Sequence, residues 1–309
     1  METIQPRRAI TIDSLQLSGG RAHRERAARI VFLAAALLSI LVSAAIIWSL
    51  AAETWTFVSQ VEWATLWTDG WFPRRGQYDV KTIVVGSLLV TGIAMVVALP
   101  LGLSAAIYLS EYARPRVRKV LKPVLEILAG IPSVVLGFFA LTFISPNLVQ
   151  RFTDARQSSI AAAGIAVGLL TIPLVASVSE DAMRSVPNAL REASFGLGAR
   201  KITTTVNVVL PAAVSGLVAA FILAISRAIG ETMVVFIAAG GLGLFTLDIF
   251  DPGITMTAAI ASQAAGTDRV VGEGLTFQSL FFVASLLFVI TLTLNLLAGR
   301  FVRRVRQVY

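Results

Sequence analysis

The sequence places two side chains of opposite charge four residues apart inside one of its most apolar stretches. Arg227 and Glu231 occur in SRAIGETM (226–233), which follows LPAAVSGLVAAFILAI and precedes VVFIAAGGLGLF. An arginine guanidinium is planar and permanently charged, and its paired donors match two oxygens of a tetrahedral oxyanion. Positions i and i+4 of one helix lie on the same face. The pair is therefore expected either to bind an anion together or to form a structural ion pair between helices.

The overall composition is that of an integral membrane protein. The 309 residues are 56% hydrophobic and only 14% charged, whereas roughly a quarter of a soluble domain is charged. The chain has no cysteine, and its single histidine, His23, lies in a polar N-terminal segment. The sequence therefore excludes disulfides and thiolate catalysis, and it argues against a histidine metal site.

Six apolar stretches have the length of a membrane-spanning helix, which needs about 20 residues. They are Ile30–Leu50, Ile83–Leu109, Val124–Ile144, Ile160–Val178, Pro211–Ala239 and Leu280–Leu297. The first is longer than the core of a signal peptide, which runs about 7–15 residues, so we expect it to be retained. The sequence thus predicts an all-α integral membrane protein with six transmembrane helices.

The basic residues are divided unequally between the two sides of such a protein. Nineteen lie in the N-terminal tail, in the loops after the second and fourth spans, and after the sixth span, whereas six lie in the other loops. By the positive-inside rule the richer side is cytoplasmic, so both termini are expected there. The net charge of +8 then reflects topology and anionic membrane lipid, and we expect no nucleic-acid partner.

We expect one membrane domain over 30–304, with a basic, disordered cytoplasmic tail over 1–29 and a cytoplasmic end over 305–309. The outer loop 51–80 holds four tryptophans, which are expected to anchor at the membrane interface or to form a docking surface. They are Trp55, Trp63, Trp67 and Trp71. The outer loop 240–278 is rich in small residues and is expected to fold partly back on the membrane.

Arg227 is too deep in its predicted span to reach the inner interface easily. A helix that starts at Pro211 places it about 24 Å from that start. A charge at mid-bilayer costs at least about 2.5–3.5 kcal/mol, so such a residue normally faces a cavity or a partner. We predict that Arg227 lines a translocation pathway, that Glu231 orients it, and that Thr232 adds a hydroxyl.

Two further features accompany the third predicted span. Pro132 and Ser133 lie inside it, and proline both frees a carbonyl and bends a helix. We interpret this as a kinked helix that lines the pathway, where Ser133 presents a hydroxyl to the ion; a simple packing kink is the alternative. Lys122 and Glu126 lie four residues apart, which predicts a local ion pair.

The inner loop over 179–211 is long and has the composition of short helices. Pro187 suits the start of a helix and NALREASF continues it. Gly196 and Gly198 then allow a turn, because glycine reaches left-handed backbone angles without Cβ strain. A second segment runs from Ala199 to Leu210. We therefore predict a helix, a glycine turn and a second helix at the inner membrane face.

This loop resembles the EAA loop of ABC-importer permeases. The resemblance rests on Glu192-Ala193-Ser194, on Gly198, and on Val208-x-Leu210-Pro211. It departs from the family pattern at Ser194 and Val208, which replace alanine and isoleucine. The resemblance implies that Glu192, Ala193, Gly198, Leu210 and Pro211 form a coupling helix that seats in a groove of a cytoplasmic ATPase. The chain has no G-x-x-x-x-G-K-[ST] motif, so ATP would be used by a separate subunit.

Three longer stretches resemble the phosphate-specific ABC transporter permeases, in the PstC-type half rather than the PstA-type half. They are ALPLGLSAAIYLSEYARPRVRKVLKPVLEILAGIPSVV (98–135), SRAIGETMVVFIAAG (226–240) and LFVITLTLNLLAGRFVRR (287–304). The resemblance implies a type I ABC-importer permease (MetI-like) architecture in a bacterial inner membrane. It also implies a PstA-type permease partner, two ATPase subunits and an extracytoplasmic phosphate-binding protein. This chain would bind no cofactor and perform no bond chemistry, because ATP and Mg²⁺ would be used by the ATPase.

Phosphate raises a hypothesis about Glu231. A carboxylate is only an acceptor, so Glu231 is expected to accept a hydrogen bond from a protonated phosphate oxygen, which sulfate lacks at neutral pH.

A permease of the same fold for sulfate, molybdate or phosphonate is the first alternative function, since an intramembrane arginine would serve those anions too. A secondary transporter or channel is the second, but it would not need the EAA-like loop. The absence of cysteine and of intramembrane histidine or paired carboxylates argues against an intramembrane enzyme.

Overall fold

The computed structural model describes residues 19–68, 70–265 and 275–305, and its chain divides into two compact units, Met1–Ala52 and Glu53–Tyr309. The described part of the first unit is one helix, the main part of α2 (Gly19–Gln60). Its large apolar side chains between positions 30 and 48 are exposed on every side, as expected of a membrane span. The helix begins at Gly19, so residues 19–29 are helical where a disordered tail was expected, while residues 1–18 lie outside the described part.

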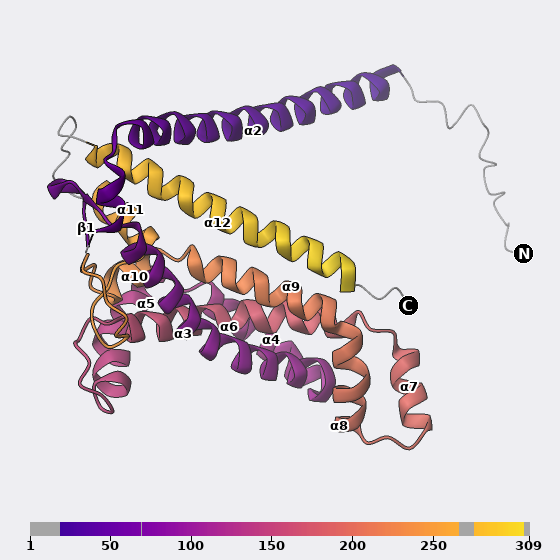
Figure 1. Ribbon diagram of the computed structural model, residues 1–309. Coiled ribbons are helices and arrows are strands. Elements are labelled where there is room, and N and C mark those ends of the chain that lie inside the picture. The colour runs from indigo at the N-terminus through magenta and orange to yellow at the C-terminus, as the bar shows by residue number, and fades with distance from the viewer. Residues whose placement is uncertain (1–18, 69, 266–274, 306–309) are drawn as a thin grey trace, which may run out of the picture. The chain divides into compact units, whose positions relative to one another are not determined.

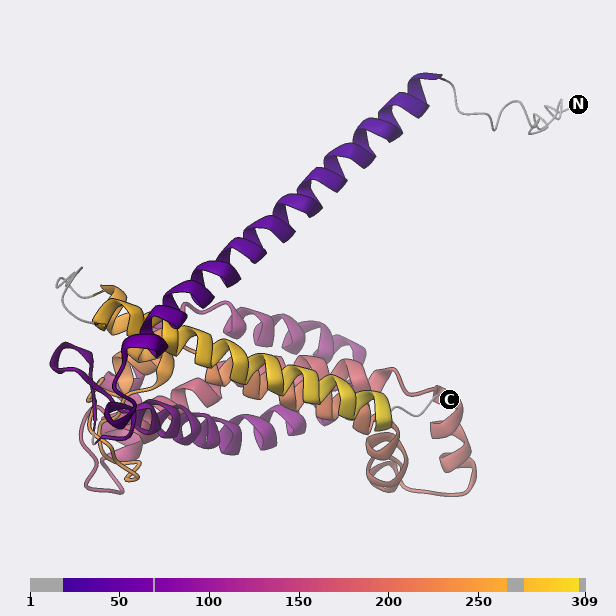
Figure 2. The same cartoon turned by 45° about the horizontal axis from the view of Figure 1, so that its top comes forward.

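The second unit is built on four long helices that lie side by side (Figure 1). They are α3 (Val80–Ile107), α6 (Ile160–Arg184), α9 (Leu210–Ile229) and α12 (Thr276–Val305). Helix α6 contacts both α3 and α9, which also contact each other, and α9 in turn contacts α12. Figure 2 shows α7 (Asn188–Gly196) and α8 (Lys201–Thr204) at the same end of this bundle as the C-terminal end of α12.

Helices α3 and α6 approach closely because small residues line their contact. A Cβ atom added at Gly164 would lie 2.7 Å from the Cβ of Ile93, and one added at Gly168 would lie 2.8 Å from the Cβ of Val97. In a bilayer, apolar side chains gain little from leaving the lipid, so close van der Waals packing is what holds two helices together. The spacing of glycines 164 and 168, one helical turn apart, thus fixes the central helix pair.

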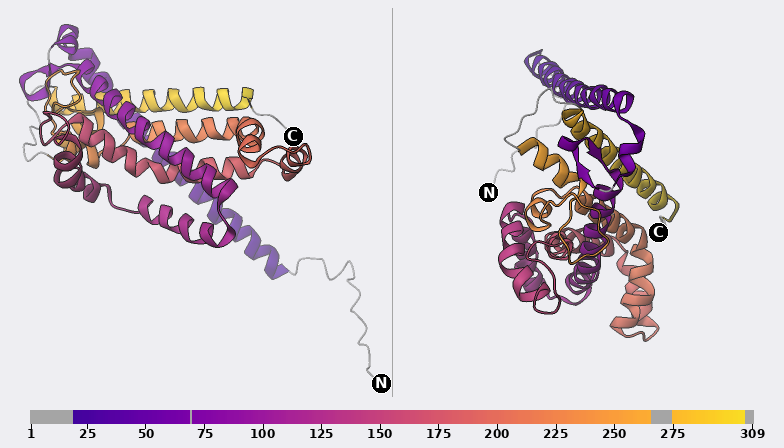
Figure 3. Two further views of the ribbon diagram at one scale, coloured as in Figure 1. Left: turned by 90° about the horizontal axis from the view of Figure 1, so that it is seen from below. Right: turned by 60° about the vertical axis from the view of Figure 1, so that its left-hand side comes forward.

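The third predicted span is broken rather than kinked. Helix α4 (Pro115–Ala129) ends before Pro132, and α5 (Ser133–Phe139) continues into the π-helical η4 (Ala140–Val149). The two parts meet at 86°, and Figure 3 shows the turn between them. Five of the described helices are long and apolar enough to cross a membrane, and the bent pair makes a sixth if it counts as one span. The prediction of one helix over Val124–Ile144 is wrong, because Gly130 and Pro132 interrupt it.

The fifth span also differs from its prediction at both ends. Helix α8, the π-helical turn η5 (Thr205–Val209) and α9 follow one another without a break, so the helix begins at Lys201 rather than near Pro211. It ends at Ile229, and a separate short helix, α10, covers Met233–Ala238. Pro211 has no N–H to donate, and it lies just after the π-helical turn η5, where the hydrogen-bond pattern of this continuous helix changes.

The opposite end of the bundle carries short elements packed around aromatic side chains. They are the 3₁₀ turn η1 (Trp63–Trp67), strand β1 (Trp71–Phe72), the 3₁₀ turn η2 (Pro73–Arg75) and the antiparallel strand β2 (Gln77–Tyr78). Phe57 stacks on Phe282 and meets Tyr78 edge to face. Burial raises the pKa of the Tyr78 hydroxyl, although hydrogen bonds with Thr276 and Leu275 oppose this. Trp71 is buried while the other three tryptophans of this region are exposed.

The described part of the outer loop 240–278 packs against the bundle, and its predicted return to the membrane surface stays a prediction. Its helix α11 (Met256–Ala265) packs against α3, α10 and α12. The amide of Met256 donates to the Ser87 hydroxyl at 3.0 Å. Residues 266–274 of this loop lie outside the described part of the chain.

Candidate functional site

Arg227 lies in the last turn of α9, where a cation interacts favourably with the helix C-terminus. Its side chain is exposed and makes no hydrogen bond or ion pair with any residue that the structure describes. It lines a cavity of about 250 Å³ between α4, α6 and α9. A guanidinium has five donors and no acceptor, so all of them remain available to water, a partner chain or an anion.

The cavity beside Arg227 has an apolar wall with a few polar groups, as small-molecule sites usually do. It is much larger than the roughly 30 Å³ that one water occupies. The polar groups are the cations Arg227 and Lys122, the carboxylates Glu126 and Glu180, and the Ser177 hydroxyl. The apolar lining comes from Leu125, Ala129, Leu170, Pro173 and Leu174.

Glu231 does not join Arg227 in this cavity. Helix α9 ends at Ile229 and Gly230 caps it, so Arg227 and Glu231 do not share a helix face. The Glu231 Oε1 atom instead accepts the backbone N–H groups of Thr232 at 3.1 Å and Val234 at 3.5 Å. The predicted i, i+4 arrangement is wrong, because the glycine between the two residues ends the helix. The side chains of Arg227 and Glu231 therefore form neither a joint anion site nor a structural ion pair with each other in this structure.

The other two predicted pathway residues also lie outside the cavity lining. Thr232 donates its hydroxyl to the Gly230 carbonyl at 3.3 Å. Ser133 is the first residue of α5 and is half-buried. Of the four predicted pathway residues, the cavity therefore brings in only Arg227.

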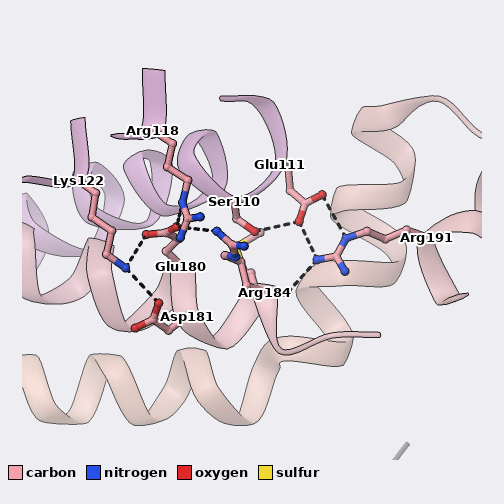
Figure 4. A network of polar contacts seen from close by, with 9 residues as sticks. Ser110, Glu111, Arg118, Lys122, Glu180, Asp181, Arg184 and Arg191 are labelled. Atoms are coloured by element: carbon pink, nitrogen blue, oxygen red, sulfur yellow. Dashed lines mark hydrogen bonds and ion pairs between the residues drawn. The ribbon is translucent and has the colours of Figure 1, made fainter. Parts of the chain in front are cut away.

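Sequence analysis missed a buried carboxylate on α6. Glu180 is 0% exposed and is surrounded by cations from two helices (Figure 4). Arg118 Nε lies 2.5 Å and Arg184 Nη1 lies 3.8 Å from Glu180 Oε1, while Lys122 Nζ lies 3.4 Å from Oε2. A carboxylate taken out of water needs such partners. The only signal in the sequence was a glutamate directly after the apolar stretch 160–178.

Lys122 shows why the local prediction on α4 was wrong. Its ammonium contacts Glu180 and, at 3.3 Å, Asp181, both on α6. Glu126, its predicted partner one turn along α4, forms no ion pair with it. A long lysine side chain reaches the nearest accessible carboxylates, and here these belong to another helix.

Arg191 links helix α7 to other parts of the bundle. Arg191 Nη2 donates to Glu111 Oε1 at 3.0 Å and to the Met183 carbonyl at 2.8 Å, and Nη1 donates to the Val186 carbonyl at 2.6 Å. Glu111 lies in the π-helical turn η3 (Tyr108–Tyr112) that follows α3. The two charged side chains are only 14% and 7% exposed. Figure 4 shows this contact beside the Glu180 cluster.

The predicted helix, glycine turn and second helix are confirmed in α7 and α8. Gly198 has φ +79°, the left-handed conformation that favours glycine. The hydroxyls of Ser194 and Thr204 lie 2.8 Å apart and tie the two helices together. Glu192 and Ala193 are exposed on α7, and Leu210 and Pro211 open α9. The coupling role of these residues stays a prediction.

A second, larger cavity of about 1110 Å³ lies between η3, α4, the end of α6, and α7 and α8. Its lining is rich in cations. They are Arg116, Arg118, Lys119, Lys122, Arg184, Arg191 and Lys201, against the carboxylates Glu111 and Glu126. The two cavities share Lys122 and Glu126, so these side chains stand at the junction between Arg227 and the end of the bundle that bears α7.

Comparisons with known proteins converge on one family. Residues 98–307 match the family described as binding-protein-dependent transport system inner membrane component. A probable ABC transporter permease, YqgH of Bacillus subtilis, is 34% identical over 85% of this chain and 87% of its own. PstA 1 of Mycobacterium tuberculosis is 33% identical over 85% and 82%, and PstC of Mesorhizobium japonicum is 28% identical over 88% of each. The latter two are named phosphate transport system permease proteins.

Solved structures show the same fold. A bacterial alginate ABC transporter gives a TM-score of 0.65 at 16% identity, covering 92% of this chain and 98% of that chain. The MetNI methionine ABC transporter gives 0.54 at 19% identity, covering 74% and 96%. The expected type I ABC-importer permease architecture is therefore confirmed.

Proposed function

Since the chain belongs to the family of binding-protein-dependent transport system inner membrane components, we propose that it is the permease subunit of an ATP-driven inorganic phosphate importer. The names of the PstC and PstA relatives support phosphate as the substrate. The observation that carries the proposal is Arg227, which lines a cavity of a membrane protein and whose guanidinium has no partner among the residues that the structure describes. Such a donor set suits a tetrahedral oxyanion.

The chain forms half of the translocation pathway and needs partners for the rest. The second half is a PstA-type permease subunit; two ATPase subunits bind and hydrolyse ATP with Mg²⁺, and an extracytoplasmic phosphate-binding protein delivers the substrate. This chain itself is not a catalyst and holds no cofactor. Relatives named PstA and PstC both match the chain, so the PstC-type assignment rests on three sequence segments. They are SEYARPRVRKVLKPVLEILAGIPSVV (110–135), SVSEDAMRSVP (177–187) and GETMVV (230–235).

The proposed location is a bacterial inner membrane, with both termini in the cytoplasm. The excess of basic residues in the loops on one side supports this orientation. Helices α7 and α8 and the C-terminal end of α12 lie at one end of the bundle (Figure 2), as the orientation requires.

The contacts of α7 suggest how ATP binding reaches the pathway. Glu192 and Ala193 are exposed on α7, which supports their proposed contact with the ATPase. Arg191 joins α7 to η3 and to the end of α6, and Glu180 joins the same end of α6 to α4 through Arg118. Closure of the ATPase dimer would move α7, and this rigid connection would shift α4 and α6 together. Arg227 then receives phosphate from the outer side and releases it inward.

The proposal is tested in proteoliposomes that hold this chain with its partner subunits and binding protein. Labelled phosphate uptake is followed with and without ATP and against excess sulfate. We expect uptake that requires ATP and resists sulfate. Uptake that sulfate blocks would indicate a permease for another oxyanion, and uptake without ATP would indicate a secondary transporter.

A further inference from the structure

Glu126 is a carboxylate with no partner in a part of the protein dominated by cations. It lies on α4, is exposed, and forms no hydrogen bond or ion pair with the residues of the described ranges. It lines both the cavity of Arg227 and the larger cationic cavity. A free carboxylate and a free guanidinium thus face the same 250 Å³ space without neutralising each other.

The second cation of that space is held in place by α6. Lys122 lies between Glu180 Oε2 at 3.4 Å and Asp181 Oδ1 at 3.3 Å. Glu180 Oε2 itself is buried and accepts no hydrogen bond from the residues that the structure describes. The ammonium therefore pairs with carboxylates of α6, and among the described residues it forms no ion pair with Glu126, although both residues line the cavity.

Two cations beside one free carboxylate make a site that distinguishes anions by their protons. Phosphate carries at least one O–H group at neutral pH, whereas sulfate carries none. A carboxylate can only accept hydrogen bonds, and an O–H donated to a carboxylate makes a short, strong bond. Sulfate would instead set an unprotonated oxygen against Glu126. Sites that require a particular hydrogen bond reject the analogue that lacks it far better than sites that sort by size.

We propose that the cavity between α4, α6 and α9 is a phosphate-binding station in which Arg227 and Lys122 bind the anion and Glu126 accepts the hydrogen bond of its protonated oxygen, so that sulfate is excluded. This proposal rests on the proposed function in phosphate transport, and it identifies Glu126 as the residue of the permease that distinguishes phosphate from sulfate. Lys122 and Glu126 also open onto the larger cavity, so phosphate leaving the station enters a space lined by further cations.

Glu231 is less suited to this task than Glu126. One of its oxygens already accepts two backbone N–H groups at the start of α10, and the residue does not line the cavity. We therefore assign the role of accepting the hydrogen bond of phosphate to Glu126 on α4 rather than to Glu231 after α9.

The test measures anion binding to the permease directly, because the binding protein would otherwise select the anion first. The permease pair with its ATPase subunits is placed in phosphatidylcholine nanodiscs without nucleotide, and bound labelled phosphate is displaced by unlabelled phosphate or by sulfate. We expect wild type to need at least about tenfold more sulfate than phosphate, as one charge-assisted hydrogen bond implies. Glu126→Gln should bring the two concentrations close together, since an amide can donate to sulfate, and Glu126→Asp should restore most of the preference.

Glu25→Gln is the matched control, because Glu25 is an exposed carboxylate of α2 and its loss should leave the preference unchanged. An unchanged preference in Glu126→Gln, or the same loss in Glu231→Gln, would overturn the proposal. Discs that contain phosphatidylglycerol test the other source of phosphate groups; if this lipid displaces inorganic phosphate, the site is a lipid site and the proposal is wrong. ATP-driven phosphate uptake by wild-type proteoliposomes decides the proposed function separately, whatever Glu126→Gln does.

Discussion

Arg191 and Arg227 are two arginines of the same bundle with opposite surroundings. Arg191 donates to Glu111 and to the carbonyls of Met183 and Val186 and is 14% exposed. Arg227 is exposed and donates to none of the residues that the structure describes. An arginine whose donors are all used inside the chain fastens one element to another. One whose donors are free is available to a ligand or a partner chain, and within a membrane its charge requires one of them.

The comparison first predicts that Arg191→Ala is the most damaging change. It leaves Glu111 buried without its cation, and removing one partner of a buried pair costs about 3–5 kcal/mol. We expect a clear fall in the Tm of the purified complex and a loss of coupling between ATP hydrolysis and uptake. Arg200→Ala is the control, because Arg200 is exposed at the start of α8. Equal Tm values for the two variants would show that Arg191 is not a fastening residue.

Arg227→Ala should give the reverse result. Transport should fall by at least about tenfold, since a charge-assisted hydrogen bond contributes about 1.5–3 kcal/mol, while the Tm should hardly change. Arg227→Lys keeps the charge but not the paired donors and should be intermediate. Uptake and thermal unfolding are measured on the same preparations. A fall in Tm like that of Arg191→Ala would make Arg227 a structural residue.

A smaller effect on transport is expected from Gly198→Ala, in the turn between α7 and α8. Gly198→Ala places a Cβ at φ +79°, which costs roughly 1–2 kcal/mol, although no atom lies within 4 Å of the added Cβ. Strain alone should therefore loosen the connection between α7 and α8. We expect reduced ATP-driven uptake with unchanged phosphate binding. Gly196→Ala, which has open space and no positive φ, serves as the control, and equal loss in both variants would contradict the explanation.

Arg156 forms an exposed ion pair, which should contribute much less to stability than the buried pair of Arg191. Its Nε lies 3.7 Å from Asp251 Oδ1, and the side chains are 69% and 45% exposed. Pairs of this kind contribute about 0–1 kcal/mol. Arg156→Ala should therefore change the free energy of unfolding by no more than about 1 kcal/mol, so that the Tm measured by thermal unfolding hardly changes. A large fall would mean that exposure in the single chain underestimates burial in the assembled importer.

Much of the bundle could be predicted from composition and glycine positions. The long apolar stretches became α2, α3, α6, α9 and α12, because a bilayer requires about 20 apolar residues whatever the neighbours are. Gly198 marked its own turn, since few other residues adopt a positive φ. The helix breaks at Pro132 and Gly230 were harder to predict, because proline and glycine are tolerated inside many membrane helices. Whether the helix continues past such a residue depends on how each segment packs.

Composition and residue spacing were enough to predict that the protein spans a membrane, that an inner loop holds a short helix and a glycine turn, and that one arginine lies deep in an apolar stretch. Which charged side chains pair with one another could be seen only in the folded structure. Lys122 pairs with Glu180 across two helices, and Glu231 accepts a hydrogen bond from the backbone of Thr232. Glu126 lines the same cavity as Arg227 and has no partner among the described residues. Local spacing predicts neighbours along one helix, but a long charged side chain pairs with whichever opposite charge the packing of helices brings closest.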